Sequence, residues 1–120
     1  MTSSESIGFA TALQHHEGPI VVVELVGEVD VFAAPDLRAA LEPLLEDDVD
    51  VCLDLTAAPF LDTTALSILL HARRRVRDRG GQFVLAGAGT IVAASLDQAG
   101  LGDLLPRYPD LQEALAALRD

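Results

Sequence analysis

The segment Asp62-Thr63-Thr64 brings a carboxylate and two hydroxyls together where an apolar strand-like run meets an apolar helix-like run. A hydroxyl in the first turn of a helix is exposed and lies near unpaired backbone N–H groups and a partial positive charge. Because such N–H groups can bind a phosphate, the position suits a phosphorylated residue. It also suits a simpler role, since Asp62 or Thr63 is a favourable N-cap and capping alone accounts for one of the three polar residues.

A further carboxylate, Asp30, follows the strand that we expect to neighbour the one before Asp62. In open α/β sheets, binding sites gather beyond the carboxyl ends of the strands, so Asp30 and Asp62 are expected at one rim. A phosphate there adds about 1.5 to 2 negative charges. At about 6 Å and an effective dielectric constant of about 40, each phosphate charge facing another negative charge costs about 1.4 kcal/mol. Two phosphate charges together therefore weaken docking to an acidic partner about a hundredfold. The residues alone leave both interpretations open, a helix cap and a charge switch.

The surrounding patterns predict the elements that position these residues. Alternating apolar residues predict a strand over 7–13, and after a turn at 15–19 a nearly continuous apolar run predicts another over 20–26. Helical spacing predicts a helix after Pro35 as far as about residue 47 and a second from Thr63 to about Arg79. Strands are predicted over 49–56 and 82–88, a short helix over 90–101, and a terminal helix that Asp110 begins.

This order of elements predicts one α/β domain with a mixed, mostly parallel sheet of four to five strands and about four helices. The 120 residues suffice for one hydrophobic core, and neither a linker nor an internal repeat divides them. We therefore expect a single domain over 1–120, with its core at about 7–118.

Composition excludes several classes of function. A net charge of -11 argues against direct binding to nucleic acid. No apolar run reaches the ~18 residues of a membrane span, and the amino-terminal residues lack a signal-peptide pattern, so the expectation is a cytoplasmic protein without a membrane partner. Cys52 is the only cysteine, which excludes an internal disulfide and predicts a small buried side chain. Five of the arginines lie within 73–79, for which we expect a mainly structural role, and the acidic remainder fits either protein docking or simple solubility.

Several motifs together resemble the STAS-domain anti-sigma factor antagonists over roughly residues 8–118. They are "GEVDVFAAPDLRAAL" (27–41), "DLTAAPFLDTTALSILL" (54–70), Gly80-Gly81 and "LDQAGLGDLL" (96–105). In that family the unphosphorylated antagonist binds an anti-sigma factor, which is also a serine/threonine kinase, and thereby frees a sigma factor. The kinase, which binds ATP and Mg²⁺, phosphorylates the hydroxyl directly after the aspartate.

The resemblance implies that Thr63 is the phosphoacceptor and that Asp30, Asp62, Thr64 and Ala65 join it in contacting the partner. It implies no cofactor for this chain and leaves the oligomeric state open. The sequence departs from the family in two places: Thr63 stands where serine is usual, and Ala65 stands where glycine is usual.

Two other functions compete with this interpretation. An enzyme would use Asp62 or Thr63 as nucleophile and His15, His16 or His71 as base, but H-E-x-x-H, G-x-S-x-G and Walker motifs are absent from the sequence, so we predict that the chain is not an enzyme. The second is a STAS protein-interaction or ligand-sensing module without phosphorylation, such as a subunit of a lipid-transport complex.

Overall fold

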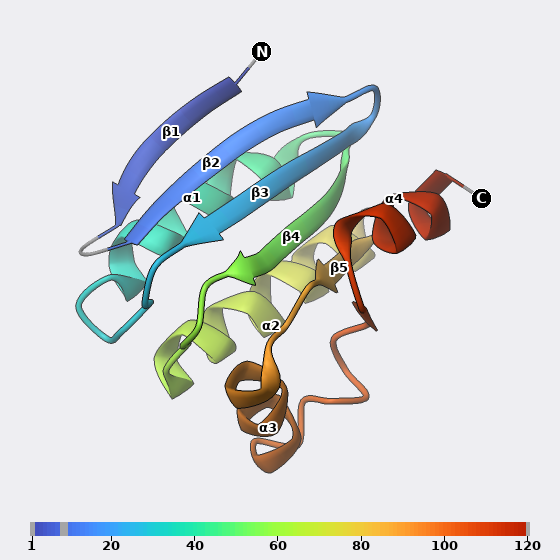
Figure 1. Ribbon diagram of the computed structural model, residues 1–120. Helices are drawn as coiled ribbons and strands as arrows, with labels where there is room; N and C mark the ends of the chain where they lie inside the picture. The colour runs from blue at the N-terminus through green and yellow to red at the C-terminus, as the bar shows by residue number, and fades with distance from the viewer. Residues whose placement is uncertain (1, 8–9, 120) are drawn as a thin grey trace.

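The computed structural model describes residues 2–7 and 10–119. Strands and helices alternate after an opening series of three strands (Figure 1). In chain order the elements are β1 (Thr2–Ile7), β2 (Ala10–Glu17), β3 (Ile20–Val26), α1 (Ala34–Glu46), β4 (Asp50–Ala57), α2 (Thr63–Asp78), β5 (Phe83–Ala86), α3 (Thr90–Gln98), β6 (Arg107–Tyr108) and α4 (Leu111–Arg119).

The six strands form one sheet whose spatial order equals their order in the chain, from β1 to β6. The pairs β1–β2 and β2–β3 are antiparallel, whereas β3–β4, β4–β5 and β5–β6 are parallel. Parallel strands need crossover connections, and here α1 connects β3 to β4, α2 connects β4 to β5 and α3 lies between β5 and β6. The predicted α/β class and mixed sheet are therefore confirmed.

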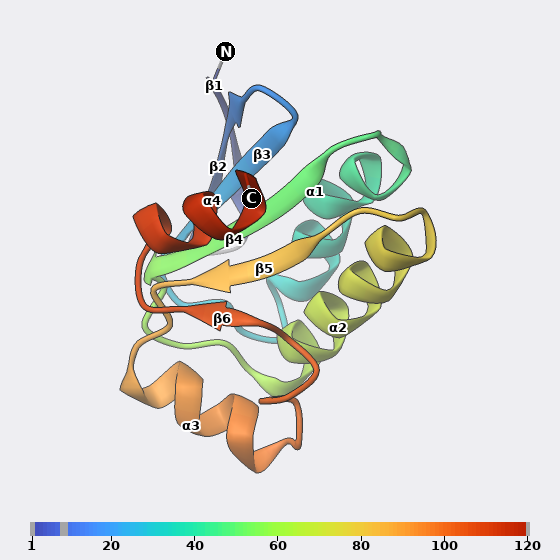
Figure 2. The ribbon, with the colours of Figure 1, turned by 90° about the vertical axis from the view of Figure 1, so that its right-hand side faces the viewer.

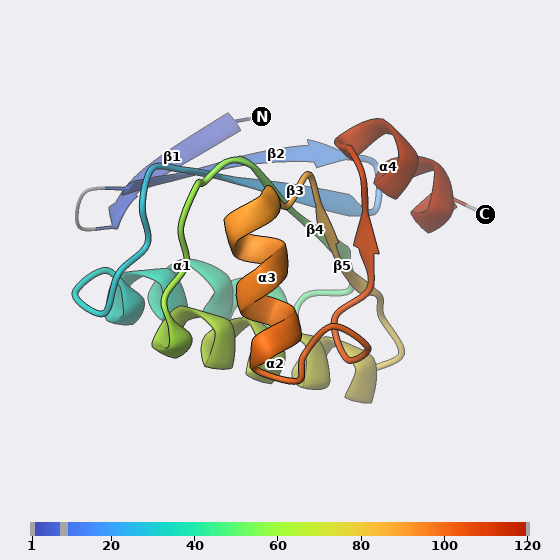
Figure 3. The ribbon, with the colours of Figure 1, turned by 60° about the horizontal axis from the view of Figure 1, so that its bottom comes forward.

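The helices form layers on both faces of the sheet. Figures 2 and 3 show α1 and α2 side by side on one face and α4 on the other, while α3 lies apart from these layers beside α2. The main core fills the space between the sheet and the α1–α2 layer, and a smaller cluster around Val22, Cys52 and Leu118 packs beneath α4. No helix in the described ranges is long and apolar enough to cross a membrane.

The two crossover helices bury the faces that their sequences indicate, with one difference. In α1 the apolar residues that recur at helical spacing are buried, namely Leu37, Ala40, Leu41, Leu44 and Leu45. In α2 the helical spacing of Leu66, Leu69 and Val76 predicts a buried face that also contains Leu70 and Arg73, but these two are only half-buried, and Ile68 and Ala72 are buried instead. Because α2 packs against α1 as well as against the sheet, its buried face is rotated from the one that a single stripe predicts.

The amino-terminal hairpin corrects the prediction. The expected turn over 15–19 is wrong for residues 15–17, which belong to β2 and pair with β3, for example His15 with Val22. Only Gly18 and Pro19 form the turn, and Gly18 has φ 62°, the left-handed conformation that glycine provides at the first position of a two-residue hairpin. Part of the strand expected over 7–13, residues 8–9, lies outside the described residues.

Two strands were not predicted. β1 is rich in polar residues, and β6 has two residues, so neither carries the alternating apolar pattern from which strands are predicted. Both are held by backbone pairing with a neighbour, β1 with β2 and β6 with β5. The sheet is therefore wider than the predicted four to five strands.

Two arginines of the 73–79 segment tie α2 to α1. The guanidinium of Arg79 donates to the carbonyl oxygens of Leu45 at 2.9 Å, Leu44 at 3.2 Å and Val49 at 2.5 Å. These carbonyls include unpaired groups at the end of α1, which a cation satisfies. Arg75 forms an ion pair with Glu46 in the same region. The structural role expected for the arginine segment is confirmed for these two residues.

Candidate functional site

The loops after β3 and β4 are joined to each other by backbone hydrogen bonds. Val29 donates from its N–H to the carbonyl of Phe60 at 2.9 Å, and its own carbonyl accepts from the N–H of Asp62 at 3.0 Å. Val29 and Leu61 thereby form a parallel bridge, and both side chains are buried. Since Asp30 and Asp62 each follow one member of this bridge, the two carboxylates lie on adjacent segments at one rim, as predicted from their places after neighbouring strands.

Asp62 is the N-cap of α2. Its backbone is extended, and its Oδ1 accepts a hydrogen bond from the N–H of Ala65 at 2.9 Å. This bond satisfies one of the N–H groups that the first turn leaves unpaired. Thr63 is therefore the first residue of the helix, in the position where an exposed hydroxyl is flanked by free helical N–H groups.

Asp30 stabilises the loop in front of α1 in a similar way. Its Oδ1 accepts from the backbone N–H of Phe32 and of Ala33, both at 3.0 Å. The resulting turn holds the side chain of Phe32 in solvent, with 82% of its surface exposed, while Ala33 is buried. Asp30 thus positions an exposed aromatic side chain at the rim, besides placing a charge there.

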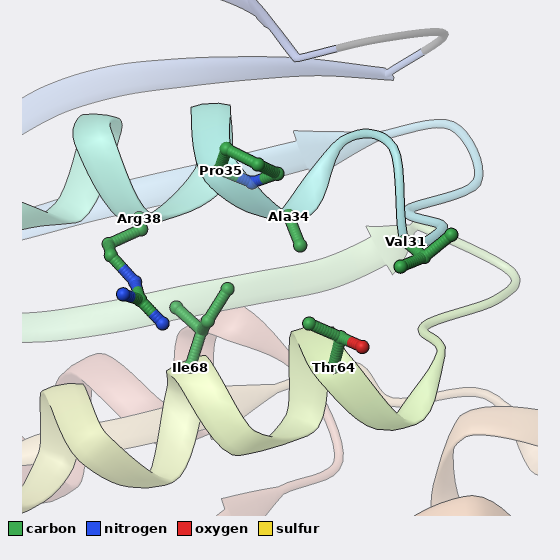
Figure 4. Close-up of a pocket in the computed structure, with 6 residues that line it drawn as sticks. All are labelled: Val31, Ala34, Pro35, Arg38, Thr64 and Ile68. Atoms are coloured by element: carbon green, nitrogen blue, oxygen red, sulfur yellow. The ribbon is translucent and has the colours of Figure 1, made fainter.

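The two threonines lie on different sides of α2. Both are exposed, but Thr63 lines a hollow of about 340 Å³ between α2 and α3 together with Ser95 and Gln98. Thr64 lines a groove of about 380 Å³ between α1 and α2, where it lies across from Ala34 and Val31 (Figure 4). Neighbouring helical residues differ by about 100° around the axis, which explains the divergence. The hydroxyls therefore have different surroundings and are not interchangeable.

Ala65 requires a correction. It was predicted to contact a partner, but its side chain is fully buried in the core between the helices and the sheet. The third residue of the helix faces inward because Thr63 and Thr64 occupy the outward positions of the first turn. Its contribution to the rim is its backbone N–H, which holds the Asp62 carboxylate.

Exposed apolar side chains surround the threonine site. Val31 is 50% exposed, Phe32 82% and Phe60 38%, and all three belong to the two loops that the Val29–Leu61 bridge joins. Grouped apolar side chains beside polar ones are typical of a protein-binding surface. In the sequence, apolar residues directly after Asp30 and directly before Asp62 indicate such a surface.

Within residues 2–7 and 10–119, the histidines considered as bases do not lie beside Thr63. His15 and His16 lie in β2, and the side chain of His15 contacts Glu17 at 3.1 Å. His71 is exposed on α2, eight residues from Thr63, which corresponds to about 12 Å along the helix axis. Among the residues that the structure describes, no three His, Cys, Asp or Glu side chains gather closely enough to hold a metal ion.

Known proteins resemble this chain in sequence over most of its length. The profile of the STAS domain matches residues 10–114. An anti-sigma-B factor antagonist of Bacillus subtilis is 31% identical over 85 residues, which cover 71% of this chain and 78% of that protein. The anti-sigma-F factor antagonist RsfA of Mycobacterium tuberculosis is 29% identical over 126 residues, which cover 97% and 92%.

Solved structures resemble the fold described above. An anti-sigma factor antagonist from Mycobacterium paratuberculosis superimposes with a TM-score of 0.85 at 30% identity, covering 92% of this chain and 95% of that one. The antagonist SpoIIAA in its unphosphorylated form has a TM-score of 0.78 at 21% identity and shares the fold. The chain therefore belongs to the STAS domain family, in which these curated relatives are antagonists of anti-sigma factors.

Proposed function

We propose that this protein is an anti-sigma factor antagonist that binds an anti-sigma factor with kinase activity, releases a sigma factor and is switched off by phosphorylation of Thr63. The names of its relatives support the antagonist role. These relatives are regulatory proteins rather than enzymes, and we propose the same for this chain, acting in the cytoplasm without a cofactor. ATP and Mg²⁺ would be bound by the kinase.

The observation that carries the proposal is the geometry at the start of α2. The Asp62 cap presents Thr63 as the first, exposed residue of the helix, and the Val29–Leu61 bridge brings the loop of Asp30 beside it. The rim thus combines a free hydroxyl, two carboxylates and the exposed Phe32 side chain. A partner that binds this rim contacts the hydroxyl and the acidic groups together.

Phosphorylation at this position changes the charge of the docking surface directly. Thr63 Oγ1 would attack the γ-phosphorus of ATP, the bond from that phosphorus to the β-phosphate oxygen would break, and the hydroxyl proton would leave to a base of the kinase. The product carries about 1.5 to 2 additional negative charges beside Asp62. An acidic group of the partner that faces the phosphate would then be repelled, which is the physical basis of the switch.

The two departures from the family are compatible with this function. A secondary hydroxyl accepts a phosphoryl group as a primary one does, and Thr63 is exposed. The methyl group of Ala65 points into the core and does not occupy the surface on which a kinase approaches. An alanine in this helix is also favoured over glycine by about 1 kcal/mol.

The deciding experiment identifies the partner and then compares two forms of the protein. Immobilised wild-type chain should capture an anti-sigma factor, and incubation of the pair with ATP and Mg²⁺ should add one phosphoryl group to the peptide that contains Thr63. The phosphorylated form should bind the anti-sigma factor more weakly in calorimetry. Equal affinities of the two forms would exclude the switch. Phosphorylation at Thr64 would show that Thr64, and not Thr63, is the phosphoacceptor. Binding without any phosphorylation would instead favour a STAS interaction module that does not switch.

A further inference from the structure

We propose that Arg38 is the charge anchor of the docking surface and binds a carboxylate side chain of the partner in the groove between α1 and α2. This inference rests on the proposed function, because its partner is the anti-sigma factor. It adds Arg38 to the docking surface formed by Asp30, Asp62 and Thr63, and it requires a carboxylate on the partner.

Arg38 is isolated among negative charges. It is the only arginine or lysine before Arg73, and the same stretch of the chain is rich in aspartate and glutamate. Its side chain is exposed, and within the described residues it takes part in none of the ion pairs. Glu42 lies one turn further along α1. An ion pair between residues four apart on a helix is weaker when the basic residue comes first, as Arg38 does here. The guanidinium is therefore available to an external carboxylate.

The groove beside Arg38 is shaped for a side chain with an apolar stem. Its walls are Val31, Ala34 and Pro35 on the α1 side and Thr64 and Ile68 on the α2 side. Figure 4 shows Arg38 beside Ile68 at one end and Val31 near Thr64 at the other. The stem of a glutamate or aspartate fits against these apolar walls while its carboxylate reaches the guanidinium, which can donate two parallel hydrogen bonds.

The groove is continuous with the proposed docking surface. Val31 follows Asp30 directly, and Thr64 follows Thr63, so a partner that covers the rim also covers the near end of the groove. Charge complementarity then selects the occupant. A chain with a net charge of -11 repels acidic surfaces in general, whereas Arg38 attracts a partner carboxylate that enters this groove. Such a single opposite charge sets the orientation of the complex and rejects partners that lack the carboxylate.

The test compares charge reversal at two exposed arginines. Arg38→Glu should weaken binding to the captured anti-sigma factor at least tenfold in calorimetry, because a repulsive carboxylate pair replaces an attractive one. Arg77→Glu is the matched control: it makes the same change of net charge at an exposed position about 20 Å along α2 from Thr64, and its affinity should stay within about twofold of wild type. Arg38→Lys should lie between them, since lysine keeps the charge and loses the paired donors.

Rescue from the partner side identifies the carboxylate. One Glu→Arg or Asp→Arg substitution in the anti-sigma factor should restore binding to Arg38→Glu while weakening binding to wild type. Equal affinities of Arg38→Glu and Arg77→Glu for the anti-sigma factor would show that Arg38 does not bind a partner carboxylate. The proposed function would stay intact, since wild type still binds. A wild-type chain that captures no anti-sigma factor would overturn the proposed function and the anchor with it.

Discussion

The backbone N–H of Asp62 donates a hydrogen bond to the carbonyl of Val29 at 3.0 Å, across two loops separated by more than thirty positions in the chain. This bond extends the pairing of β3 and β4 beyond the ends of both strands, as the Val29–Leu61 bridge shows. It places Asp30 next to the start of α2 and makes one surface from two loops. Three predictions concern this surface, and a fourth concerns Cys52 in the cluster beneath α4.

Replacing Asp62 by alanine should remove the N-cap of α2. The N–H of Ala65 would lose its acceptor, and the free energy of unfolding should fall by about 1 kcal/mol in urea titrations. Asp62→Asn is the control, because an asparagine side chain also accepts this bond and caps a helix about as well. Should both substitutions destabilise the chain equally, the carboxylate charge rather than the capping bond would be the stabilising feature.

Thr63→Glu should imitate the phosphorylated state in part. It adds one negative charge, and a single facing carboxylate of the partner at about 6 Å and an effective dielectric constant of about 40 costs about 1.4 kcal/mol, or about tenfold in the dissociation constant. Thr63→Val keeps the branched shape without the hydroxyl, so it should bind like wild type and remain unmodified by the kinase. Calorimetry measures both affinities, and unfolding curves check that the folds are equal. A Thr63→Glu protein that binds like Thr63→Val would contradict the electrostatic mechanism.

Phe32→Ala should weaken partner binding without changing stability. The ring is 82% exposed and packs little within the chain, so the free energy of unfolding should change by no more than about 0.5 kcal/mol. An aromatic side chain held at the centre of an interface commonly contributes more than 1 kcal/mol, which predicts an affinity loss of about tenfold. Leu104→Ala, an exposed apolar residue between α3 and β6, is the control and should leave affinity unchanged. Comparable losses for both variants would argue against a specific role of the loop after Asp30.

Cys52 predicts a pH dependence of stability. Burial, and to a smaller extent the charge of Asp54, raise the pKa of its thiol to about 12 from an ordinary value of 9.0. Above about pH 9 the unfolded chain releases the thiol proton while the folded chain keeps it, so this contribution to stability is present below pH 9 and is lost as the pH rises towards 12. The loss is at most about 1.4 kcal/mol per pH unit.

The measurement is the difference between wild type and Cys52→Ala in urea unfolding at pH 8 to 11. The alanine variant should be less sensitive to alkaline pH, because it has no thiol to titrate in the unfolded chain. The native thiol should also react slowly with a thiol reagent at pH 8, since it is enclosed beneath α4. The same pH dependence in both proteins would show that the thiol does not contribute.

Elements with a strong local pattern were predictable. The leucines of α1 repeat at helical spacing and are buried, and β3 and β4 read as apolar runs because helices cover both of their faces. The cap before Thr63 was predictable too, since aspartate before an apolar helical run is an N-cap signal. β1 and β6 were not, because their stabilisation comes from backbone hydrogen bonds to another strand rather than from their own side chains.

The sequence by itself determined the class of fold, the family and the order of Asp30, Asp62 and Thr63 after their strands, because hydrophobic periodicity and short polar motifs are local properties. Only the tertiary structure decided which neighbouring residues share a surface. It buried Ala65, turned Thr63 towards α3 and Thr64 towards α1, and set Arg38 across the groove from Ile68. These placements depend on how α2 packs between the sheet, α1 and α3, and that packing is a long-range balance of buried area and shape that no local pattern records.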